Sequence, residues 1–201
     1  MKWIGLSGGM GCGKSTALQV FKELNCGVSS ADQIVSDLYN SKNHLIEILK
    51  SLDLNLTSSD KKDVSAIKAQ ISKVVFSDKA KLKKLENYLH PIVRKSSEAI
   101  KSEHQKQGFK VSVYEVPLLF EKHLENLFFR TICIGATKNI QIERIKNRNP
   151  DWSLSEINLR LSTQMSLSDK KEKADFYIDN SKDLKNLKSK CEHVLKEVLD
   201  L

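Results

Sequence analysis

The chain has 201 residues, and 40% of them are hydrophobic, which suits one α/β domain with insertions rather than two full domains. Its formal net charge is +8, but the lysines are scattered among Glu and Asp, and no aromatic residues interleave with a dense basic run. This pattern is typical of solvated helix faces and argues against a nucleic-acid partner. Since no apolar run approaches the roughly 20 residues that span a bilayer, we also expect no membrane partner.

The cysteine pattern indicates the compartment. The four cysteines show no C-x-x-C spacing: Cys12, Cys26, Cys133 and Cys191. Such cysteines are typical of reduced thiols in a cytosolic protein. Because Met1 and Lys2 lead directly into an apolar run without a leader pattern, the sequence predicts a cytoplasmic protein.

Strand and helix patterns alternate along the chain. The sequence predicts strands at 2–7, 27–30, 110–116, 130–136 and 176–179. Helical periodicity predicts helices at 16–24, 31–39, 45–51, 64–75, 79–107, 138–147, 154–164 and 184–199. This alternation predicts a parallel five-stranded sheet covered on both faces by helices. Two details are less regular: residues 74–76 are an alternative strand inside a helical pattern, and 111–116 alternates more than a buried parallel strand usually does.

Two stretches interrupt the alternation. Residues 40–108 carry helical patterns without a convincing strand, which predicts a helical sub-domain. Residues 144–173 predict a polar helical hairpin rich in Arg and Lys, where a phosphate-transferring enzyme would have a closing lid. Residues 55–63 are the most loop-like stretch. The nucleotide-binding core would then comprise residues 1–39, 109–143 and 174–201.

Residues 8–15 read Gly-Gly-Met-Gly-Cys-Gly-Lys-Ser and match the phosphate-loop pattern G-x-x-x-x-G-K-[ST] at each fixed position. The loop falls between a predicted strand and a predicted helix, whose free N–H groups favour anions. In such a loop Lys14 reaches the β- and γ-phosphates, and the hydroxyl of Ser15 ligates Mg²⁺. The sequence therefore predicts nucleoside triphosphate binding, against the alternative of a glycine-rich turn with a chance lysine. Cys12 is either a reactive thiol or, as we favour, a small residue at a variable position.

Asp32 follows the second predicted strand, and strand ends in such sheets face the nucleotide crevice. Its carboxylate could accept the proton of a substrate hydroxyl, or it could cap the next helix.

His90-Pro91 is expected to interrupt the long helical stretch, and Arg94 lies one turn further. Glu115 either acts on Mg²⁺ through water or is a solvated strand end.

The residues after these strands suggest further contacts. Leu118, Leu119 and Phe120 are more typical of a core than of a substrate surface. Gln141, Arg144 and Arg148 recur at helical spacing on one face. Arginines on a lid can neutralise charge on a transferring phosphoryl group, although an ordinary solvated basic face has the same spacing.

Taken together, these motifs resemble the dephospho-coenzyme A kinase family over essentially the whole chain. The resemblance includes the loop from Ile4 to Thr16, Ala31-Asp32, Val75-Phe76, Leu89-His-Pro-Ile-Val-Arg94 and Val116-Pro-Leu-Leu-Phe-Glu121. It continues through Gln141, Arg144, Arg148, Gln164-Met165, Lys170 and Ile178-Asp-Asn180. The His-Pro and Pro-Leu-Leu-Phe-Glu segments are much more specific than the phosphate loop, which many families share.

The resemblance implies a P-loop kinase core with a helical substrate-binding insertion and a helical lid. It implies transfer of the ATP γ-phosphate, with Mg²⁺, to the ribose 3′-hydroxyl of dephospho-coenzyme A. The catalytic residues it implies are Lys14, Asp32 as general base and Arg144. The implied nucleotide contacts are Gly9, Met10, Gly11, Cys12, Gly13, Lys14, Ser15, Thr16, Arg148 and Asn180. The implied substrate contacts are Asp32, Lys68, His90, Arg94, Pro117, Leu118 and Glu121.

The sequence departs from the family pattern at Ser30, where Asp is common, at Lys68, where Arg is common, and at Ser181-Lys182, where a Gly is common nearby. A bidentate contact at Lys68 is thereby put in doubt.

Three other functions fit the phosphate loop: a nucleoside or nucleotide kinase, a GTPase switch and a nucleic-acid-stimulated ATPase. The GTPase alternative lacks an Asn-Lys-x-Asp segment, for which Asp179-Asn180 is a poor substitute.

Overall fold

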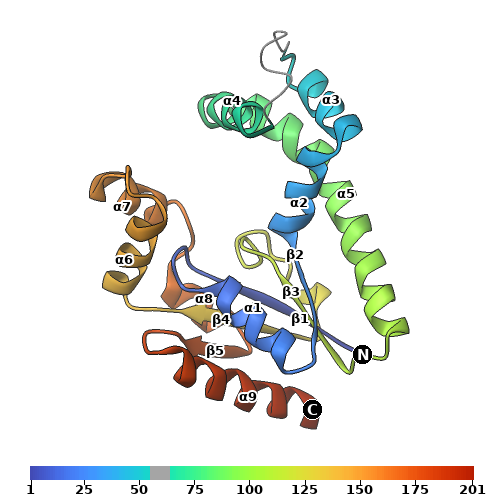
Figure 1. The fold of residues 1–201 in the computed structure, drawn as a ribbon, viewed down its shortest axis with the longest axis vertical. Coiled ribbons are helices and arrows are strands. Elements are labelled where there is room, and N and C mark those ends of the chain that lie inside the picture. Colours follow the sequence, from blue (N-terminus) through green and yellow to red (C-terminus); the bar gives the residue numbers. More distant parts are fainter. Residues whose placement is uncertain (55–63) are drawn as a thin grey trace. The chain divides into compact units, whose positions relative to one another are not determined.

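The computed structural model describes residues 1–54 and 64–201 (Figure 1). It divides into two compact units, one formed by residues 1–30 with 101–201 and the other by residues 31–100. The stretch 55–63, expected to be a loop, lies outside the described residues. Within the described part, no helix is both long enough and apolar enough to cross a bilayer.

The first unit is built on a five-stranded sheet (Figure 1). Its strands are β1 (Lys2–Gly8), β2 (Gly27–Ser30), β3 (Val111–Glu115), β4 (Arg130–Gly135) and β5 (Phe176–Asp179), all parallel, in the order β2-β3-β1-β4-β5. The predicted parallel five-stranded sheet is confirmed. Glu115 pairs with both Leu6 and Ser30, and Gly8 pairs with Ile134. The carboxyl ends of β1, β2, β3 and β4 therefore share one edge.

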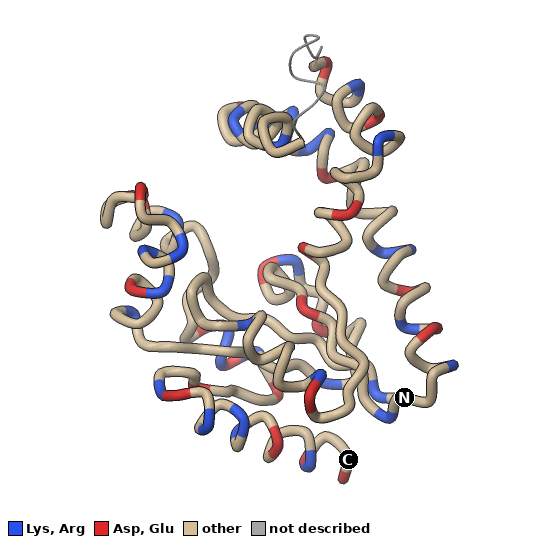
Figure 2. The backbone as a smooth tube through the Cα atoms, viewed as in Figure 1, with Lys and Arg blue, Asp and Glu red and all other residues tan. Residues whose placement is uncertain are grey.

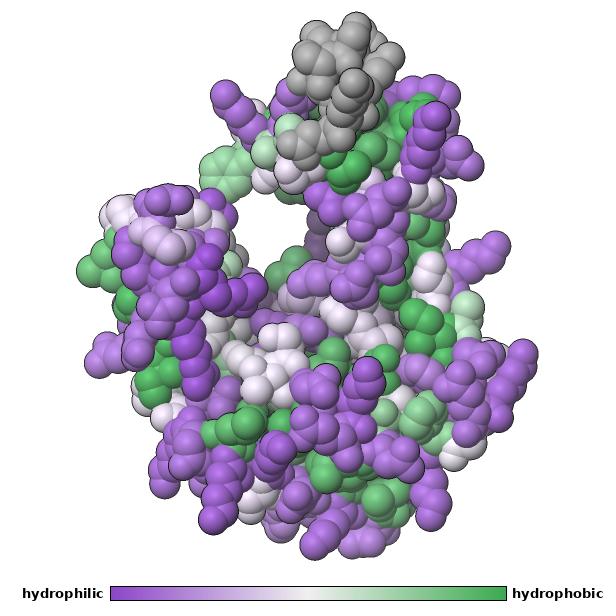
Figure 3. Space-filling model, in the orientation of Figure 1, coloured by the Kyte–Doolittle hydropathy of each residue, from purple (hydrophilic) through white to green (hydrophobic). Residues whose placement is uncertain are grey.

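Helices α1 (Lys14–Glu23) and α9 (Leu184–Asp200) pack on one face of the sheet. Their apolar stripes include Ala17, Val20 and Phe21 on α1 and Leu187, Cys191, Val194 and Val198 on α9. Burial of a side chain such as Phe21 contributes about 1.5–3 kcal/mol. The outward side of α9 carries lysines among acidic residues and is largely hydrophilic (Figures 2 and 3). These lysines therefore lie on a solvated helix face, as the charge pattern predicted.

The other face of the sheet is covered by the end of the long helix α5 (Lys79–Lys106), by α8 (Leu167–Lys173) and by the turn leading to the 3-10 helix η2 (Glu125–Leu127). Every residue of β3 is consequently buried. The Ser112 hydroxyl lies 2.7 Å from Nδ1 of His104 and 3.3 Å from the carbonyl oxygen of Gly27. The alternating pattern of β3 thus reflects one apolar face and one face with satisfied polar groups, and neither faces water.

Helices α6 (Lys138–Arg148) and α7 (Leu154–Ser162) follow β4 in the chain and pack against each other. Helix α6 runs unbroken past residue 144, where we expected the lid to begin. The short helix α8 was not predicted as a separate element. It has seven residues, three of them lysines in its last turn, and one buried side chain, so it carries too little apolar periodicity to be recognised.

Residues 31–100 form the second unit from α2 (Ala31–Asn40), α3 (Lys42–Ser51), α4 (Val64–Ser77) and most of α5. Within the described part of this unit there is no strand, so the run at 74–76 is helical. A separate apolar cluster fills the unit and includes Ile48, Leu52, Ile67, Ile71, Leu85 and Leu89. Helix α2 groups with this unit, whereas the sequence had suggested that the core extended to residue 39.

Helix α5 continues through Pro91, so the expected interruption at His90-Pro91 is wrong. A proline inside a helix costs about 3 kcal/mol, because it removes one backbone hydrogen bond and crowds the preceding turn. Leu85 and Leu89 before the proline are buried in the cluster, and Val93 after it packs against the same cluster. Burial of these side chains, at about 1.5–3 kcal/mol each, offsets the cost.

Candidate active site

The phosphate loop connects the carboxyl end of β1, at Gly8, to the start of α1, at Lys14. Gly13 is the N-cap of α1 in a left-handed conformation with φ of 84°, and no side chain caps the helix. A β-carbon at Gly13 would overlap the side-chain amide of Asn180. Glycine is therefore required here by both conformation and space. The uncapped helix end presents its N–H groups and the positive end of the helix dipole to an anion.

Lys14 lies against its own loop. Its Nζ atom donates to the carbonyl oxygen of Gly9 at 3.1 Å and to that of Gly8 at 3.3 Å. Ser15 and Thr16 are exposed in the first turn of α1. The lysine charge, the exposed hydroxyls and the helix N-terminus are thus concentrated at one end of the loop, which suits the terminal phosphates of a nucleotide.

The side chains at the loop could supply one protein ligand to Mg²⁺. Across residues 1–54 and 64–201, no group of three or more His, Cys, Asp and Glu side chains could hold a metal ion. Mg²⁺ bound with nucleotides keeps several waters and takes phosphate oxygens as ligands, so it needs few ligands from the protein. A single hydroxyl, that of Ser15, therefore fits as the protein ligand.

Three side-chain amides hold the loop backbone. Gln141 on α6 donates through Nε2 to the carbonyl oxygen of Met10 at 2.9 Å and to Sγ of Cys12 at 3.0 Å. Asn180, just after β5, donates through Nδ2 to the carbonyl oxygen of Cys12 at 2.9 Å. Gln164, between α7 and α8, accepts the N–H of Met10 through Oε1 at 3.2 Å. Three segments distant in sequence therefore fix the loop conformation.

Gln141, Arg144 and Arg148 share a helix, but the structure separates their environments. Gln141 is buried beneath the loop, Arg144 is half-buried and Arg148 is exposed. A solvated basic face is therefore the wrong interpretation for Gln141. Gln141 and Gln164 bind the loop backbone. No local sequence signal indicates this role, because only the fold brings these amides to the loop.

Arg144 carries a free donor beside the loop. Its Nη1 atom is buried and has no hydrogen-bond partner among the described residues. The position that a β-carbon on Gly13 would occupy lies 3.6 Å from this atom. A buried guanidinium nitrogen without a partner is unfavourable, and an anionic ligand at the loop would supply the missing acceptor.

Cys12 is fully buried in the loop, beneath its backbone. Burial raises the pKa of its thiol above the usual value, although the nearby charge of Lys14 acts in the opposite direction. A protonated, inaccessible thiol is unreactive. The structure therefore favours the interpretation of Cys12 as a small packing residue.

The segment after β3 divides between core and surface. Leu119 and Phe120 are fully buried, whereas Leu118 is 41% exposed, so only part of this apolar run belongs to the core. Pro117 accepts a hydrogen bond from the Ser7 hydroxyl at 3.0 Å through its carbonyl oxygen. Glu115, at the end of β3, is buried, so its interpretation as a solvated strand end is wrong.

Glu121 ends this segment and forms an ion pair with Lys170 of α8, at 2.7 Å between Oε1 and Nζ. The same oxygen accepts the backbone N–H of Met165 at 3.2 Å. The sequence alone did not assign Lys170 a role. A lysine in a lysine-rich helix is normally solvated, so the helix itself did not indicate a buried ion pair. Only the position of Lys170 in the family pattern marked it as a residue of interest.

The remaining predicted residues lie in the second unit. Asp32 is exposed and is the second residue of α2, so it lies in the first turn rather than before the helix. Lys68 on α4 has its Nζ 3.5 Å from Oγ of Ser36 and 5.6 Å from the ring centre of Tyr39. His90 and Arg94 are exposed on α5, four residues apart and so on one face of the helix. Arg94 forms an ion pair with Glu98 at 3.1 Å.

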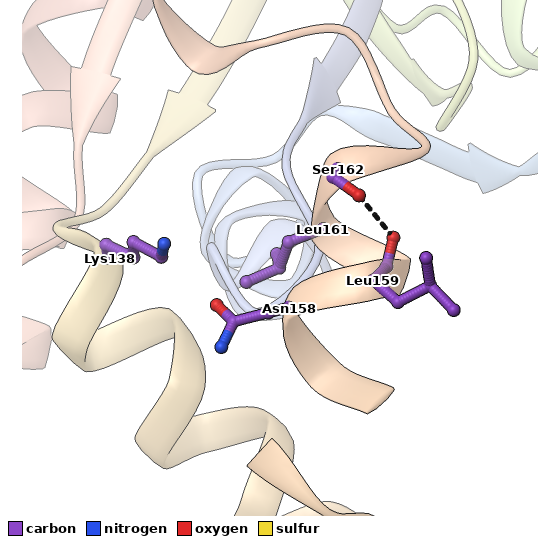
Figure 4. A pocket seen from close by; sticks show the side chains of 5 residues that line it. All are labelled: Lys138, Asn158, Leu159, Leu161 and Ser162. Carbon is purple, nitrogen blue, oxygen red and sulfur yellow. Dashed lines mark hydrogen bonds between the residues drawn. The ribbon is translucent and has the colours of Figure 1, made fainter. Parts of the chain in front are cut away.

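A surface cavity of about 610 Å³ lies between the start of α6 and helix α7 (Figure 4). Its lining residues are Lys138, Asn158, Leu159, Leu161 and Ser162. The Ser162 hydroxyl donates to the carbonyl oxygen of Leu159 at 2.8 Å, as the figure shows, so it is satisfied within α7. None of the lining residues belongs to the phosphate loop, and the cavity is therefore separate from the loop's own anion site.

Comparisons with known proteins agree with this geometry. Residues 2–186 match the family model described as dephospho-CoA kinase. A dephospho-CoA kinase of Bdellovibrio bacteriovorus is 30% identical over 100% of this chain and 98% of its own length, and one of Bartonella quintana is 34% identical over 99% of both. The solved structure of a dephospho-CoA kinase from Campylobacter jejuni has a TM-score of 0.69 and 29% identity, and the match covers 98% of this chain and 97% of that one. The chain belongs to the dephospho-CoA kinase family, with the P-loop kinase fold.

Proposed function

We infer that this protein transfers the γ-phosphate of ATP to the ribose 3′-hydroxyl of dephospho-coenzyme A, which is the final step of coenzyme A synthesis. Family membership over almost the whole chain carries the choice of reaction. The loop geometry supports it, because Lys14, the uncapped end of α1 and the free Nη1 of Arg144 converge at one anion site. Phosphoryl transfer needs mainly positioning and stabilisation of charge, and these groups supply both.

The proposed nucleotide contacts are the backbone and side chains of residues 9–16, with Arg148 and Asn180. The loop N–H groups would bind the phosphates, and Lys14 would neutralise the β- and γ-phosphate oxygens. Mg²⁺, held by Ser15, would supply further charge neutralisation on those oxygens. Because the Nδ2 atom of Asn180 already donates to the loop backbone, a contact of this residue with adenine would use its carbonyl oxygen.

Asp32 is the proposed general base, from its place two residues after the carboxyl end of β2. Its carboxylate would take the proton of the 3′-hydroxyl as that oxygen forms a bond to the γ-phosphorus. The bond from this phosphorus to the β–γ bridging oxygen then breaks, and ADP leaves. Lys68, His90, Arg94, Pro117 and Leu118 are the proposed contacts of dephospho-coenzyme A. For Glu121 the contacts favour a different role, through Lys170.

The substrate assignment is tested by measuring ADP release with ATP and Mg²⁺ against a panel of acceptors. We expect activity with dephospho-coenzyme A and none above background with nucleosides or nucleoside monophosphates. The same assay with DNA or RNA in place of an acceptor should show no stimulation. Preferred phosphorylation of a nucleoside monophosphate would overturn the assignment in favour of a nucleotide kinase.

The cytoplasmic location that we infer is supported by four free, buried cysteines.

Replacing Arg144 with alanine should lower kcat by about 10³-fold while changing the ATP dissociation constant much less. The reason is that an arginine beside the loop meets the phosphoryl group mainly as charge redistributes in the transition state. Single-turnover rates and ATP titration measure the two effects separately. Lys138→Ala, at the exposed start of the same helix, is the matched control and should behave like the wild type. A tenfold weaker ATP affinity with an unchanged single-turnover rate would contradict this role.

His90→Ala and Arg94→Ala should each raise the KM for dephospho-coenzyme A by about 10- to 150-fold and leave the KM for ATP nearly unchanged, since losing a charge-assisted contact costs about 1.5–3 kcal/mol. Both side chains are exposed, so neither change should disturb packing. Steady-state kinetics with each substrate varied in turn measures the split. Lys95→Ala, exposed on the same helix, is the control. Equal losses of affinity for both substrates would point to a general defect instead.

A further inference from the structure

Lys170 is fully buried, which is unusual for a lysine, and its side chain has 0% relative exposure. Moving an ammonium group out of water is costly unless a partner compensates for the lost hydration. Here the partner is Glu121, at 2.7 Å, whose own side chain is 18% exposed. A second contact, at 3.4 Å, joins Nζ of Lys170 to the carbonyl oxygen of Pro117. The ion pair thus ties α8 to both ends of the segment that follows β3.

The same pair holds the chain that leads into α8. Oε1 of Glu121 also accepts the backbone N–H of Met165 at 3.2 Å. The residue before Met165 is Gln164, whose Oε1 accepts the N–H of Met10 in the phosphate loop at 3.2 Å. A continuous set of polar contacts therefore runs from Lys170 through Glu121 and Met165 to Gln164 and the loop.

The contacts of Glu121 disfavour a direct role in binding dephospho-coenzyme A. Its Oε1 atom already accepts from two donors. Its Oε2 atom is buried and has no hydrogen-bond partner among the described residues. An oxygen that is covered in this way cannot meet a substrate group unless the surrounding segment moves.

We propose that the Glu121–Lys170 ion pair positions Gln164 against Met10 and thereby fixes the phosphate loop in its ATP-binding conformation. Glu121 and Lys170 are positioning residues in this scheme, and Gln164 is the group that transmits their effect to the loop. The proposal deepens the inferred kinase function and rests on it for the kinetic readout. Its effect on ATP binding can be measured without any acceptor.

The test compares Glu121→Gln, Lys170→Met and Gln164→Ala, and the double variant Glu121→Gln/Gln164→Ala. Lys173→Met, an exposed lysine of α8, is the matched control. ATP dissociation constants are measured by titration, and KM values are measured for each substrate, alongside thermal unfolding. We expect each single change to weaken ATP binding by about 2- to 30-fold, the range for coupling through packed contacts. The KM for dephospho-coenzyme A at saturating ATP should change little, and the control should match the wild type.

The double variant gives the decisive result. If Glu121 acts through Gln164, changing both residues should weaken ATP binding no more than the stronger single change does. Additive losses would overturn the proposal, because they mean that the two residues act independently. A rise in the KM for dephospho-coenzyme A alone, in Glu121→Gln, would overturn it in favour of direct substrate contact. Should Glu121→Gln or Lys170→Met not fold, Glu121→Asp replaces them in the cycle with Gln164→Ala, with the same criterion.

These outcomes separate the proposal from the inferred kinase function. If the wild-type protein binds ATP but phosphorylates a different acceptor, the substrate assignment fails while the ATP-binding cycle still reports on the ion pair. If dephospho-coenzyme A is phosphorylated but Glu121→Gln and Gln164→Ala bind ATP like the wild type, the positioning role fails and the function stands.

Discussion

Lys14→Ala should reduce kcat by at least about 10²- to 10³-fold, the usual cost of losing one preorganised charge donor at a reacting centre. The ammonium of Lys14 lies on the loop backbone, with Nζ 3.1 Å from the carbonyl oxygen of Gly9, so it is already placed where phosphate oxygens would bind. The methylene stem is half-buried, and its loss should lower stability only slightly. Product formation under saturating substrates, with a thermal melt of each variant, measures the two effects.

Two further variants make this result specific. Lys22→Ala removes an exposed lysine from the last turn of the same helix and should leave the rate unchanged. Lys14→Arg keeps a positive charge, but its planar guanidinium group is larger than the ammonium group that lies against the loop. This variant should therefore be little more active than Lys14→Ala. A folded Lys14→Ala protein with nearly normal turnover would show that residues 8–15 do not form the phosphate site.

The sequence was sufficient for the sheet and for the phosphate loop. Each strand was recognisable as a short segment between helical patterns, and alternation of that kind leaves a parallel sheet as the consistent arrangement. The family resemblance, based on segments such as Leu89–Arg94 and Val116–Glu121, is confirmed by the match over residues 2–186. These signals are local in the chain, so they can be read without tertiary structure.

Other features could not be predicted because they depend on tertiary contacts. Pro91 is tolerated inside α5 since Leu89 before it and Val93 after it pack in a cluster that only the folded second unit creates. Glu115 and Lys170 are charged residues that a sequence-based interpretation places in water, yet the fold buries both. The amides of Gln141 and Gln164 reach the loop from positions more than a hundred residues away in the chain, at separations of 131 and 154 residues from Met10.

Asp32→Asn should leave folding and ligand binding close to the wild type and lower the rate of transfer by about 10²- to 10⁴-fold, the usual contribution of a general base. Asparagine has the same size, and the loss of the negative charge from the first turn of α2 should lower stability by only about 0.3–1 kcal/mol through the helix dipole. It cannot take up the proton of the 3′-hydroxyl at neutral pH, so the chemical step alone should suffer.

The matched control for this change is Asp37→Asn on the same helix. Asp37 is exposed and accepts a hydrogen bond from Nε2 of Gln33 at 2.8 Å, which the oxygen of asparagine can also accept. Product formation, titrations of ATP and of dephospho-coenzyme A, and thermal melts should distinguish the two variants. Asp32 is exposed in the first turn of α2, so its carboxylate is not committed to packing and is free to act on a substrate. If Asp32→Asn turns over at nearly the normal rate, Asp32 serves only the helix, and Glu115 at the buried end of β3 becomes the next carboxylate to test as the base.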